Sequence, residues 1–232
     1  MHLATENLTK IYGNVTALDN VSLKIPFGSV CCIAGPNGSG KTTLLETITR
    51  NIKLTRGKVI LPENIKIGHS YQVPNLCEDL KVKDNIKFFI DIRNAIGKEY
   101  GEWIDKLVSV TSMNEYDEYY VSDLSTGLKK RLDIVVSLLD NPDVIAMDEP
   151  TAGLDVNART EILDLIQFLN QNKKTVLIAT HDLSGFDRIC TYLIILNKGV
   201  KLLELPISDI DKEQSGILKG GISKIYEKYI NP

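Results

Sequence analysis

Residues 35–42 read Gly35-Pro36-Asn37-Gly38-Ser39-Gly40-Lys41-Thr42, which fits the phosphate-binding loop pattern G-x-x-x-x-G-K-[ST] at every fixed position. An apolar run precedes the loop at 30–34, and helix-like spacing of leucine and isoleucine follows it. A strand, a glycine-rich loop and a helix N-terminus together offer backbone N–H groups and a positive dipole end to an anion. In this pattern the lysine reaches the β- and γ-phosphates and the next hydroxyl holds Mg²⁺. The sequence therefore predicts a nucleoside triphosphate site rather than a chance glycine-rich turn.

The composition of the chain is ordinary for a soluble globular protein. The 232 residues are 43% hydrophobic and 25% charged, and the net charge of −3 gives no general reason to expect a nucleic-acid partner. No segment approaches the ~18 consecutive apolar residues of a membrane span, and the N-terminus lacks the basic and apolar regions of a signal peptide. We therefore expect a cytoplasmic protein whose cysteines, which show no metal-ligand spacing, are reduced.

The order of hydrophobic patterns predicts an α/β fold with a helical insertion. Strand-like alternation fills the first residues, amphipathic helical patterns fill 76–140, and continuous apolar runs typical of buried strands return at 144–147 and 176–179. We expect an α/β core with a β region over 1–75 and 141–205, a helical subdomain over 76–140, and a short tail over 206–232. The tail carries the pattern of one last amphipathic helix.

Two carboxylates follow the apolar run 144–147. In open parallel sheets, ligands gather at the carboxyl ends of strands. Asp148 is then placed to reach Mg²⁺, directly or through water, and Glu149 is placed to polarise an attacking water. A surface Asp-Glu pair without function is the alternative, but the phosphate-binding loop upstream makes it the weaker interpretation.

Two further polar residues follow strand-like runs. His181 ends the run 176–179, beside the carboxylates, where a γ-phosphate would lie. Gln72 follows the run that ends near Tyr71, and its amide oxygen can accept from water or coordinate Mg²⁺. A polar linker residue is an equally good interpretation of Gln72 from the sequence alone.

Leu124-Ser125-Thr126-Gly127 opens the third helical pattern of the insertion. A serine at a helix start offers a hydroxyl, free N–H groups and the helix dipole to an anion, although an ordinary helix cap has the same features. The site would lie far from the phosphate-binding loop of the same chain. If it binds phosphate, we expect that phosphate to belong to a second subunit.

The order of these motifs resembles the ATP-binding cassette (ABC) superfamily from about residue 3 to about residue 205. The fold implied is a P-loop NTPase of the ABC type, with a RecA-like parallel-sheet core, an N-terminal antiparallel β region and a helical insertion subdomain. The resemblance assigns nucleotide binding to Tyr12, which would stack on adenine, and to Gly35, Pro36, Asn37, Gly38, Ser39, Gly40, Lys41, Thr42 and Thr43. It assigns catalysis to Glu149, His181, Gln72 and Asp155, the last in a segment like the D-loop, and metal binding to Thr42, Gln72 and Asp148.

The family also implies partners. Two cassettes face each other head to tail, and each ATP lies between the phosphate-binding loop of one and Ser125, Thr126 and Gly127 of the other. The second cassette can be an identical or a different chain. Hydrolysis of ATP with Mg²⁺ then moves a separate membrane permease, which holds the cassette at the inner face of the cell membrane. No nucleic-acid partner is implied.

The segment Leu124-Ser125-Thr126-Gly127-Leu128 resembles the signature sequence of the family. It departs from the usual L-S-G-G-Q, because Thr126 replaces the first glycine and Leu128 replaces glutamine. The β-carbon of Thr126 restricts positive φ, so we expect the departure to change the geometry and rate of the site rather than to abolish it. Residues 79–89 and 127–132 are similar to ATPases of ABC-2-type exporters, which move drugs, antibiotics, peptides or polysaccharides outward. An importer ATPase and a low-turnover nucleotide sensor remain the alternatives. Residues Leu76, Leu80, Val82, Ile86 and Phe89 are candidates for a permease groove, or for core.

Overall fold

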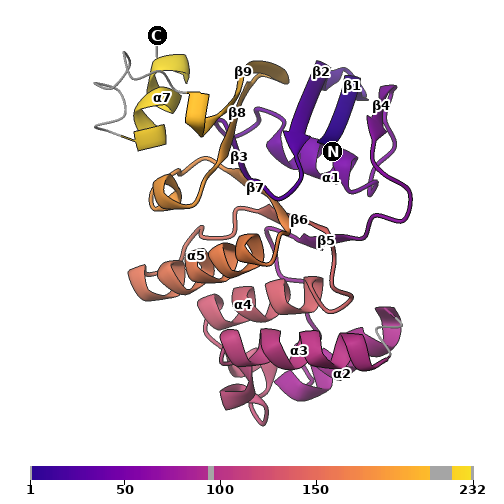
Figure 1. The fold of residues 1–232 in the computed structure, drawn as a ribbon, viewed down its shortest axis with the longest axis vertical. Coiled ribbons are helices and arrows are strands. Elements are labelled where there is room, and N and C mark those ends of the chain that lie inside the picture. The colour runs from indigo at the N-terminus through magenta and orange to yellow at the C-terminus, as the bar shows by residue number, and fades with distance from the viewer. Residues whose placement is uncertain (1, 94–96, 210–220, 231–232) are drawn as a thin grey trace.

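The computed structural model describes residues 2–93, 97–209 and 221–230. Its centre is a sheet of six strands in the order β5-β6-β7-β3-β8-β9 (Figure 1). These strands are β3 (Val30–Ala34), β5 (Ile67–Ser70), β6 (Val144–Asp148), β7 (Thr175–Thr180), β8 (Tyr192–Asn197) and β9 (Val200–Pro206). Strands β5, β6, β7, β3 and β8 pair in parallel, in that order. Strand β9 is antiparallel to β8 and forms a hairpin with it.

The central strands are apolar throughout because both faces of the sheet are covered. Every residue of β3, β6 and β7 is buried. Helix α1 (Lys41–Ile48) packs with the N-terminal strands on one face, and α5 (Val156–Gln171) packs on the other. The parallel arrangement places the carboxyl ends of β3, β6 and β7 at one edge, where the polar residues of the predicted site follow them.

A second, antiparallel sheet forms the N-terminal β region, in the order β2-β1-β4. Its strands are β1 (His2–Tyr12), β2 (Val15–Pro26) and β4 (Arg56–Ile60). Leu3, Leu23 and Ile25 alternate inward and join the core beneath α1. The fold class expected from the sequence is therefore confirmed.

The helical subdomain lies at one end of the molecule, below the sheet in Figure 1. It consists of α2 (Val82–Arg93), α3 (Lys98–Val110), α4 (Thr126–Ser137) and the short 3₁₀ turns η1 (Met113–Tyr116) and η2 (Val121–Asp123). Of the residues considered for a permease groove, Val82 is fully buried and Ile86 is 7% exposed, so both belong to the core of this subdomain. Val110, the last residue of α3, is 47% exposed.

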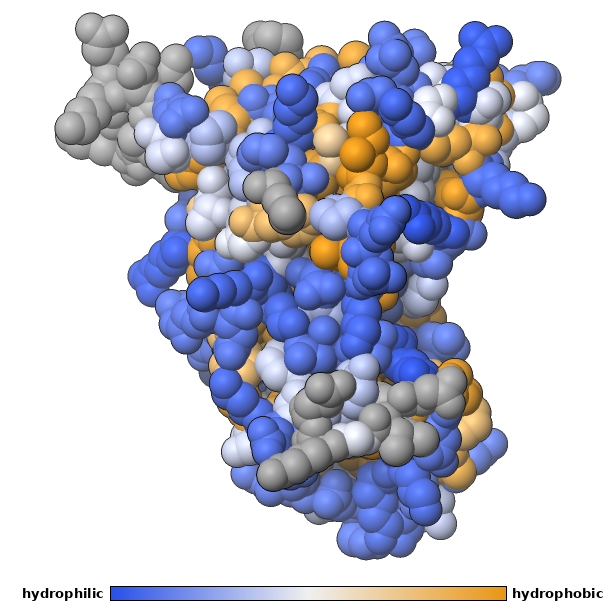
Figure 2. Space-filling model, turned by 45° about the vertical axis from the view of Figure 1, so that its right-hand side comes forward, coloured by the Kyte–Doolittle hydropathy of each residue, from blue (hydrophilic) through white to orange (hydrophobic). Residues whose placement is uncertain are grey.

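The tail helix α7 (Gly221–Ile230) packs on the main sheet. Ile222 and Ile225 are buried in the same cluster as α5, and the Ile222 amide donates to Asp187 Oδ1 at 2.7 Å, just after the turn η3 (Phe186–Arg188) begins. The turn η4 (Ile207–Asp209) leads out of β9. Figure 2 shows one face of the molecule, with hydrophilic residues covering most of the lower part and hydrophobic residues gathered in the upper part. Across the described ranges, every helix is too short or too polar to span a bilayer.

Candidate functional site

A cleft of about 520 Å³ opens at the carboxyl edge of the main sheet. Its lining brings together segments that are far apart in the sequence. The residues are Tyr12, Val15, Thr16, Ala17, Asn37, Gly38, Ser39, Gly40, Lys41, Thr42, Thr43, Gln72, Glu149 and His181. Most of the nucleotide-binding and catalytic candidates therefore meet in one cleft.

The phosphate-binding loop is held in shape by close backbone contacts. Gly40, which precedes α1, has φ +101°, and a β-carbon there would lie 2.5 Å from the carbonyl oxygen of Ala17. A β-carbon on Gly35 would lie 2.4 Å from the carbonyl oxygen of Leu196 in β8. Both positions therefore require glycine, because a side chain would push the loop away from its neighbouring strands.

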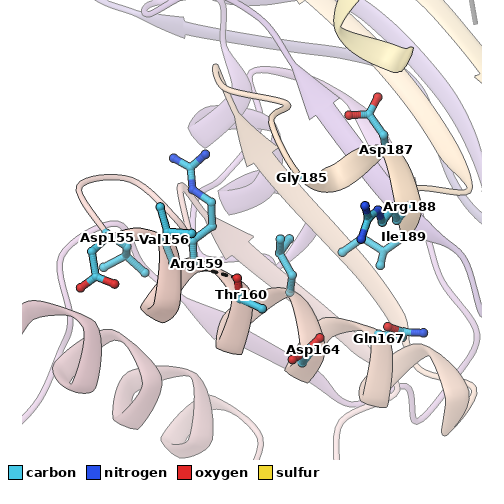
Figure 3. A pocket seen from close by; sticks show the side chains of 12 residues that line it. Asp155, Val156, Arg159, Thr160, Asp164, Gln167, Gly185, Asp187, Arg188 and Ile189 are labelled. Carbon is cyan, nitrogen blue, oxygen red and sulfur yellow. Dashed lines mark hydrogen bonds between the residues drawn. The ribbon is translucent and has the colours of Figure 1, made fainter. Parts of the chain in front are cut away.

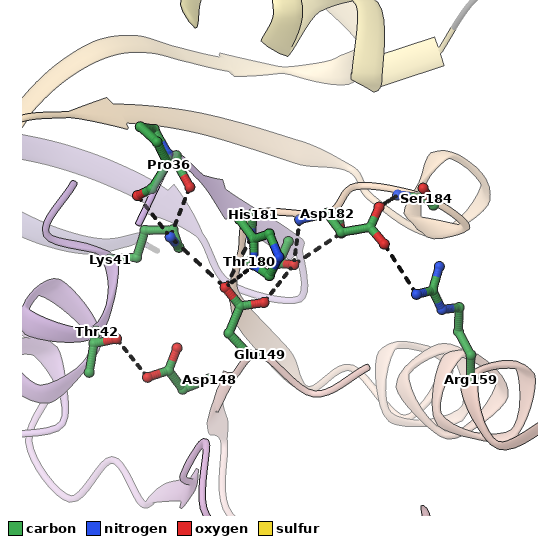
Figure 4. Close-up of polar contacts among 11 residues, drawn as sticks. Pro36, Lys41, Thr42, Asp148, Glu149, Arg159, Thr180, His181, Asp182 and Ser184 are labelled. Carbon is green, nitrogen blue, oxygen red and sulfur yellow. Dashed lines mark hydrogen bonds and ion pairs between the residues drawn. The ribbon is translucent and has the colours of Figure 1, made fainter. Parts of the chain in front are cut away.

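Lys41 folds back over this loop. Its Nζ donates to the carbonyl oxygens of Gly35 at 2.8 Å and Pro36 at 3.2 Å, and lies 3.9 Å from Glu149 Oε1 (Figure 4). Burial lowers the pKa of the amine, while the nearby carboxylates of Glu149 and Asp148 oppose that shift. Gly35 and Pro36 thus hold the lysine through their carbonyl oxygens, whereas the loop lines the cleft from Asn37 onward.

Thr42 and Asp148 supply the oxygen atoms that a divalent cation would need. The Thr42 hydroxyl donates to Asp148 Oδ2 at 2.7 Å. Asp148 is 3% exposed, and its Oδ1 is a buried atom without a hydrogen-bond partner among the described residues. Burial raises the pKa of this carboxyl group, because a charged carboxylate is disfavoured away from water. A hydroxyl and a carboxylate are hard oxygen ligands, so the donor set fits Mg²⁺.

Glu149 turns away from Asp148 although the two are adjacent. Its backbone has φ +47°, in the left-handed region that side chains rarely adopt, and its amide donates to the Ala179 carbonyl at 2.9 Å. The Thr180 hydroxyl donates to Oε2 at 3.1 Å, and the His181 amide donates to Oε1 at 3.1 Å. His181 Nδ1 also lies 2.8 Å from Oε1. A buried carboxylate is therefore aimed beside the phosphate-binding loop.

Gln72, Tyr12 and His181 lie at the rim. Gln72 is an exposed residue two positions beyond the end of β5, and it lines the cleft. Tyr12 is 45% exposed at the end of β1, with Lys10 Nζ 4.6 Å from its ring centroid. A planar ring at the mouth of the cleft can accept a nucleobase.

The structure places Asp155 outside this cleft. Its Oδ1 accepts from the amides of Asn157 and Ala158, which caps α5. Asp155 instead lines a larger hollow of about 780 Å³ between α5 and the loop 185–189 (Figure 3). None of the phosphate-loop residues lines that hollow. The larger of the two cavities is therefore not the candidate nucleotide site.

The signature residues also lie apart from the cleft of their own chain. Ser125 caps α4 by accepting from the Leu128 amide at 3.3 Å, and both Ser125 and Thr126 are exposed. Thr126 is the first residue of α4 and is absent from the positive-φ positions, so its β-carbon causes no backbone strain. Gly127 packs close to α5, because a β-carbon there would lie 2.9 Å from the Ala158 β-carbon.

Sequence reasoning missed several residues around the site. Thr16 and Ala17 line the cleft because β2 begins directly after the turn at Gly13, a signal that the sequence did contain. Lys130 and Asp133 are each 4% exposed on α4 beside the cleft. The helical pattern gave no signal that these charged residues would be buried.

Comparisons with known proteins agree with this geometry. The sequence profile of the family described as ABC transporter matches residues 18–152. An uncharacterised ABC transporter ATP-binding protein of Methanocaldococcus jannaschii is 32% identical over 228 residues, covering 98% of this chain and 86% of the relative. Nod factor export ATP-binding protein I of Cupriavidus metallidurans is 31% identical, covering 91% and 73%. A methionine import ATP-binding protein of Halalkalibacterium halodurans is 30% identical, covering 97% and 72%.

Solved structures with the same fold include cassettes in different states. A nucleotide-free ATP-binding cassette from an ABC transporter has a TM-score of 0.82 and 27% identity, and each chain covers 100% of the other. A dimeric cassette in a post-hydrolysis state with ADP and phosphate has a TM-score of 0.76 and 30% identity, covering 88% of this chain and 98% of that one.

Proposed function

The chain belongs to the ABC transporter family as an ATPase cassette, and we propose that it binds and hydrolyses ATP with Mg²⁺ to power a separate membrane permease, in the direction of export. The observation that carries the proposal is the meeting of Lys41, the Thr42–Asp148 pair and Glu149 around one cleft. Phosphoryl transfer from a nucleotide requires a positive charge near the phosphates, oxygen ligands for Mg²⁺ and a carboxylate near the attacking water. Lys41, the Thr42–Asp148 pair and Glu149 would supply these groups in that order.

We assign each group a part in the reaction. Lys41 exchanges its two carbonyl partners for the β- and γ-phosphates. Thr42 and Asp148 would hold Mg²⁺, which when bound would neutralise charge on the phosphates. Glu149 orients a water whose oxygen bonds to the γ-phosphorus as the bond to the bridging oxygen breaks, so that ADP and phosphate leave. His181 holds the Glu149 carboxylate in position.

The partners and direction rest on different support. The exposed Ser125 end of α4 is complementary to a nucleotide held by a second cassette, and a dimer has been described for the similar post-hydrolysis cassette. A relative named for Nod factor export and the similarity of residues 127–132 to exporter ATPases favour export. A relative named for methionine import makes an importer the second candidate. In either case we place the subunit at the inner face of the membrane, on the permease.

The catalytic assignment is tested by Glu149→Gln. We expect this variant to bind ATP as the wild type does, because the phosphate-binding loop is unchanged, and to lose about a hundredfold or more in phosphate release. Calorimetry measures binding, and a phosphate assay measures turnover. Turnover close to that of the wild type would contradict the role of Glu149.

The direction of transport is tested with the subunit bound to its permease in inside-out membrane vesicles. ATP added outside such vesicles should drive labelled peptides, antibiotics or oligosaccharides into the lumen. Loss of preloaded solute from the lumen on addition of ATP would instead support the importer.

A further inference from the structure

The segment that carries Gln72 has no regular structure, yet it is held at both ends by one helix. Residues 71–75 follow β5 directly. The Ser70 hydroxyl donates to Asp133 Oδ2 at 2.6 Å, and the Asn75 amide donates to Asp133 Oδ1 at 3.1 Å. Lys130 donates to the carbonyl oxygen of Tyr71, the residue immediately before Gln72. Both ends of the segment are therefore attached to α4.

Lys130 also contacts the end of the strand that carries the metal-binding carboxylate. Its Nζ lies 3.4 Å from the carbonyl oxygen of Asp148. Lys130 and Asp133 are three residues apart on α4, so they lie on the same face of the helix. One face of α4 thus contacts both the backbone beside Gln72 and the backbone of Asp148.

The other side of the segment is fixed to the sheet. The Tyr71 ring stacks on His69 of β5 with centroids 4.1 Å apart, and the Tyr71 hydroxyl accepts from Asn51 Nδ2 at 2.8 Å. Asn51 lies shortly after the end of α1, the helix that begins at Lys41. The segment therefore spans from the nucleotide-binding core to α4.

Lys130 and Asp133 are two buried charged residues, and buried charges are unfavourable for the packing of a helix. Burying an ammonium and a carboxylate costs several kcal/mol per ion before pairing, and apolar residues of similar size would pack at lower cost. The Lys130 ammonium bonds to the carbonyl oxygens of Tyr71 and Asp148, and the two Asp133 carboxylate oxygens accept from Ser70 and Asn75. Their cost is offset by contacts that fix the position of that segment.

We propose that Lys130 and Asp133 form a positioning pair, called here the α4 clamp, that sets Gln72 and Asp148 against the nucleotide and couples them to the signature end of α4. The inference rests on the proposed ATPase function. Ser125 caps the same helix, so a displacement of α4 caused by a second subunit's nucleotide is carried to Gln72 of the first. The clamp thus links two parts of one chain. One is the Ser125 end of α4, which would contact the partner's nucleotide, and the other is Gln72 and Asp148, which would contact the chain's own nucleotide.

The test compares Lys130→Met with Lys129→Met. Both changes remove an ammonium from α4, but Lys129 pairs with the exposed Glu78 and does not contact the Gln72 segment. We expect Lys130→Met to keep its affinity for ATP measured without metal. We expect kcat to fall by about ten- to hundredfold, with a higher Mg²⁺ concentration for half-maximal rate. Lys129→Met should change both by less than about twofold.

A second variant and a second measurement separate positioning from folding. In Asp133→Asn the amide oxygen can still accept from the Asn75 amide, and the new NH₂ group can donate to the Ser70 hydroxyl, so both contacts are kept but the charge is lost. Its kcat should therefore lie between those of the wild type and Lys130→Met. In the nucleotide-free protein, hydrogen exchange of a peptide covering 70–80 should be faster in Lys130→Met than in Lys129→Met.

Three outcomes would overturn the clamp. The first is Lys130→Met with kcat and Mg²⁺ dependence equal to those of Lys129→Met. The second is unchanged exchange in the 70–80 peptide. The third is a uniform loss of metal-free ATP binding and thermal stability, which would indicate a merely structural role. A wild-type protein without turnover would contradict the proposed function instead, while the exchange experiment would still decide the clamp.

Discussion

At the scale of single residues, the site depends on two adjacent carboxylates that face different groups. Asp148 ends β6 and faces Thr42, whereas the left-handed backbone at Glu149 directs the next carboxylate toward Thr180 and His181. A left-handed non-glycine residue costs about 1–3 kcal/mol. The amide bond to Ala179 and the contacts to the carboxylate hold it there. The strained backbone points two neighbours in sequence in different directions, as the two tasks proposed for them, metal binding and water orientation, require.

His69 carries a pH dependence that can be measured. Burial, with a smaller contribution from the Lys130 charge, lowers the pKa of His69 to about 4. In the unfolded chain the same imidazole takes up a proton near pH 6.5. Because the unfolded state then binds more protons than the folded state, the free energy of unfolding is fully retained above pH 6.5 and decreases as the pH falls toward 4. Between pH 7 and 4.5 we expect wild type to lose about 1–2 kcal/mol more than His69→Gln, allowing for the solvent that reaches the ring. Urea unfolding at both pH values measures the difference, and equal losses in the two proteins would contradict it.

The sequence predicted which residues meet in the cleft wherever a motif follows a buried strand. Lys41, Asp148, Glu149 and His181 lie together because parallel strands end at one edge of the sheet. Asp155 could not be placed in the same way, because its loop continues past that edge and caps α5. The α4 clamp could not be predicted either, since a helical pattern does not reveal which charged residues will find buried partners.

At the scale of elements, the tail shows how local pattern and tertiary packing differ. The spacing of apolar residues predicted an amphipathic helix, and α7 has that form. Its partner was not predictable, because the pattern marks an apolar face without saying what covers it. Ile222 and Ile225 pack into the cluster of α5, β7 and β8. The helix is therefore part of the core rather than an appendage.

The packing of α7 predicts that one end of the chain contributes to global stability. Ile225 is 6% exposed and Tyr229, on the same helix, is 38% exposed. Ile225→Asp should lower the free energy of unfolding by about 2–4 kcal/mol, because it places a carboxylate in an apolar cluster. Tyr229→Asp is the control and should change it by less than about 1 kcal/mol. Urea midpoints compare the two variants, and equal midpoints would refute the packing argument.

At the scale of the whole molecule, the two halves of the predicted ATP site lie in separate parts of one chain. The cleft belongs to the α/β core, and Ser125 lies at the exposed end of α4 in the helical subdomain. The close approach of Gly127 to Ala158 ties that end to α5. We therefore propose that the signature end over the cleft comes from a second cassette.

This arrangement predicts a dimer that depends on ATP. The Glu149→Gln protein with ATP should double its mass in light scattering, because nucleotide is retained between the two chains. Adding Ser125→Arg should keep it monomeric by placing a bulky cation at the signature end. Ser109→Arg, at an exposed position of α3, is the control and should leave the dimer intact. A dimer that persists with Ser125→Arg would place the interface elsewhere.

The exposed signature end of α4 has a further consequence, for the rate at which the protein would consume ATP in the cell. If every catalytic site needs two chains, the rate of ATP consumption rises with the square of subunit concentration when the protein is dilute. Two subunits docked on one permease experience each other at an effective concentration in the millimolar range. On the proposed arrangement, a subunit that has not yet bound its permease would hydrolyse little ATP, and assembly with the permease would raise the rate.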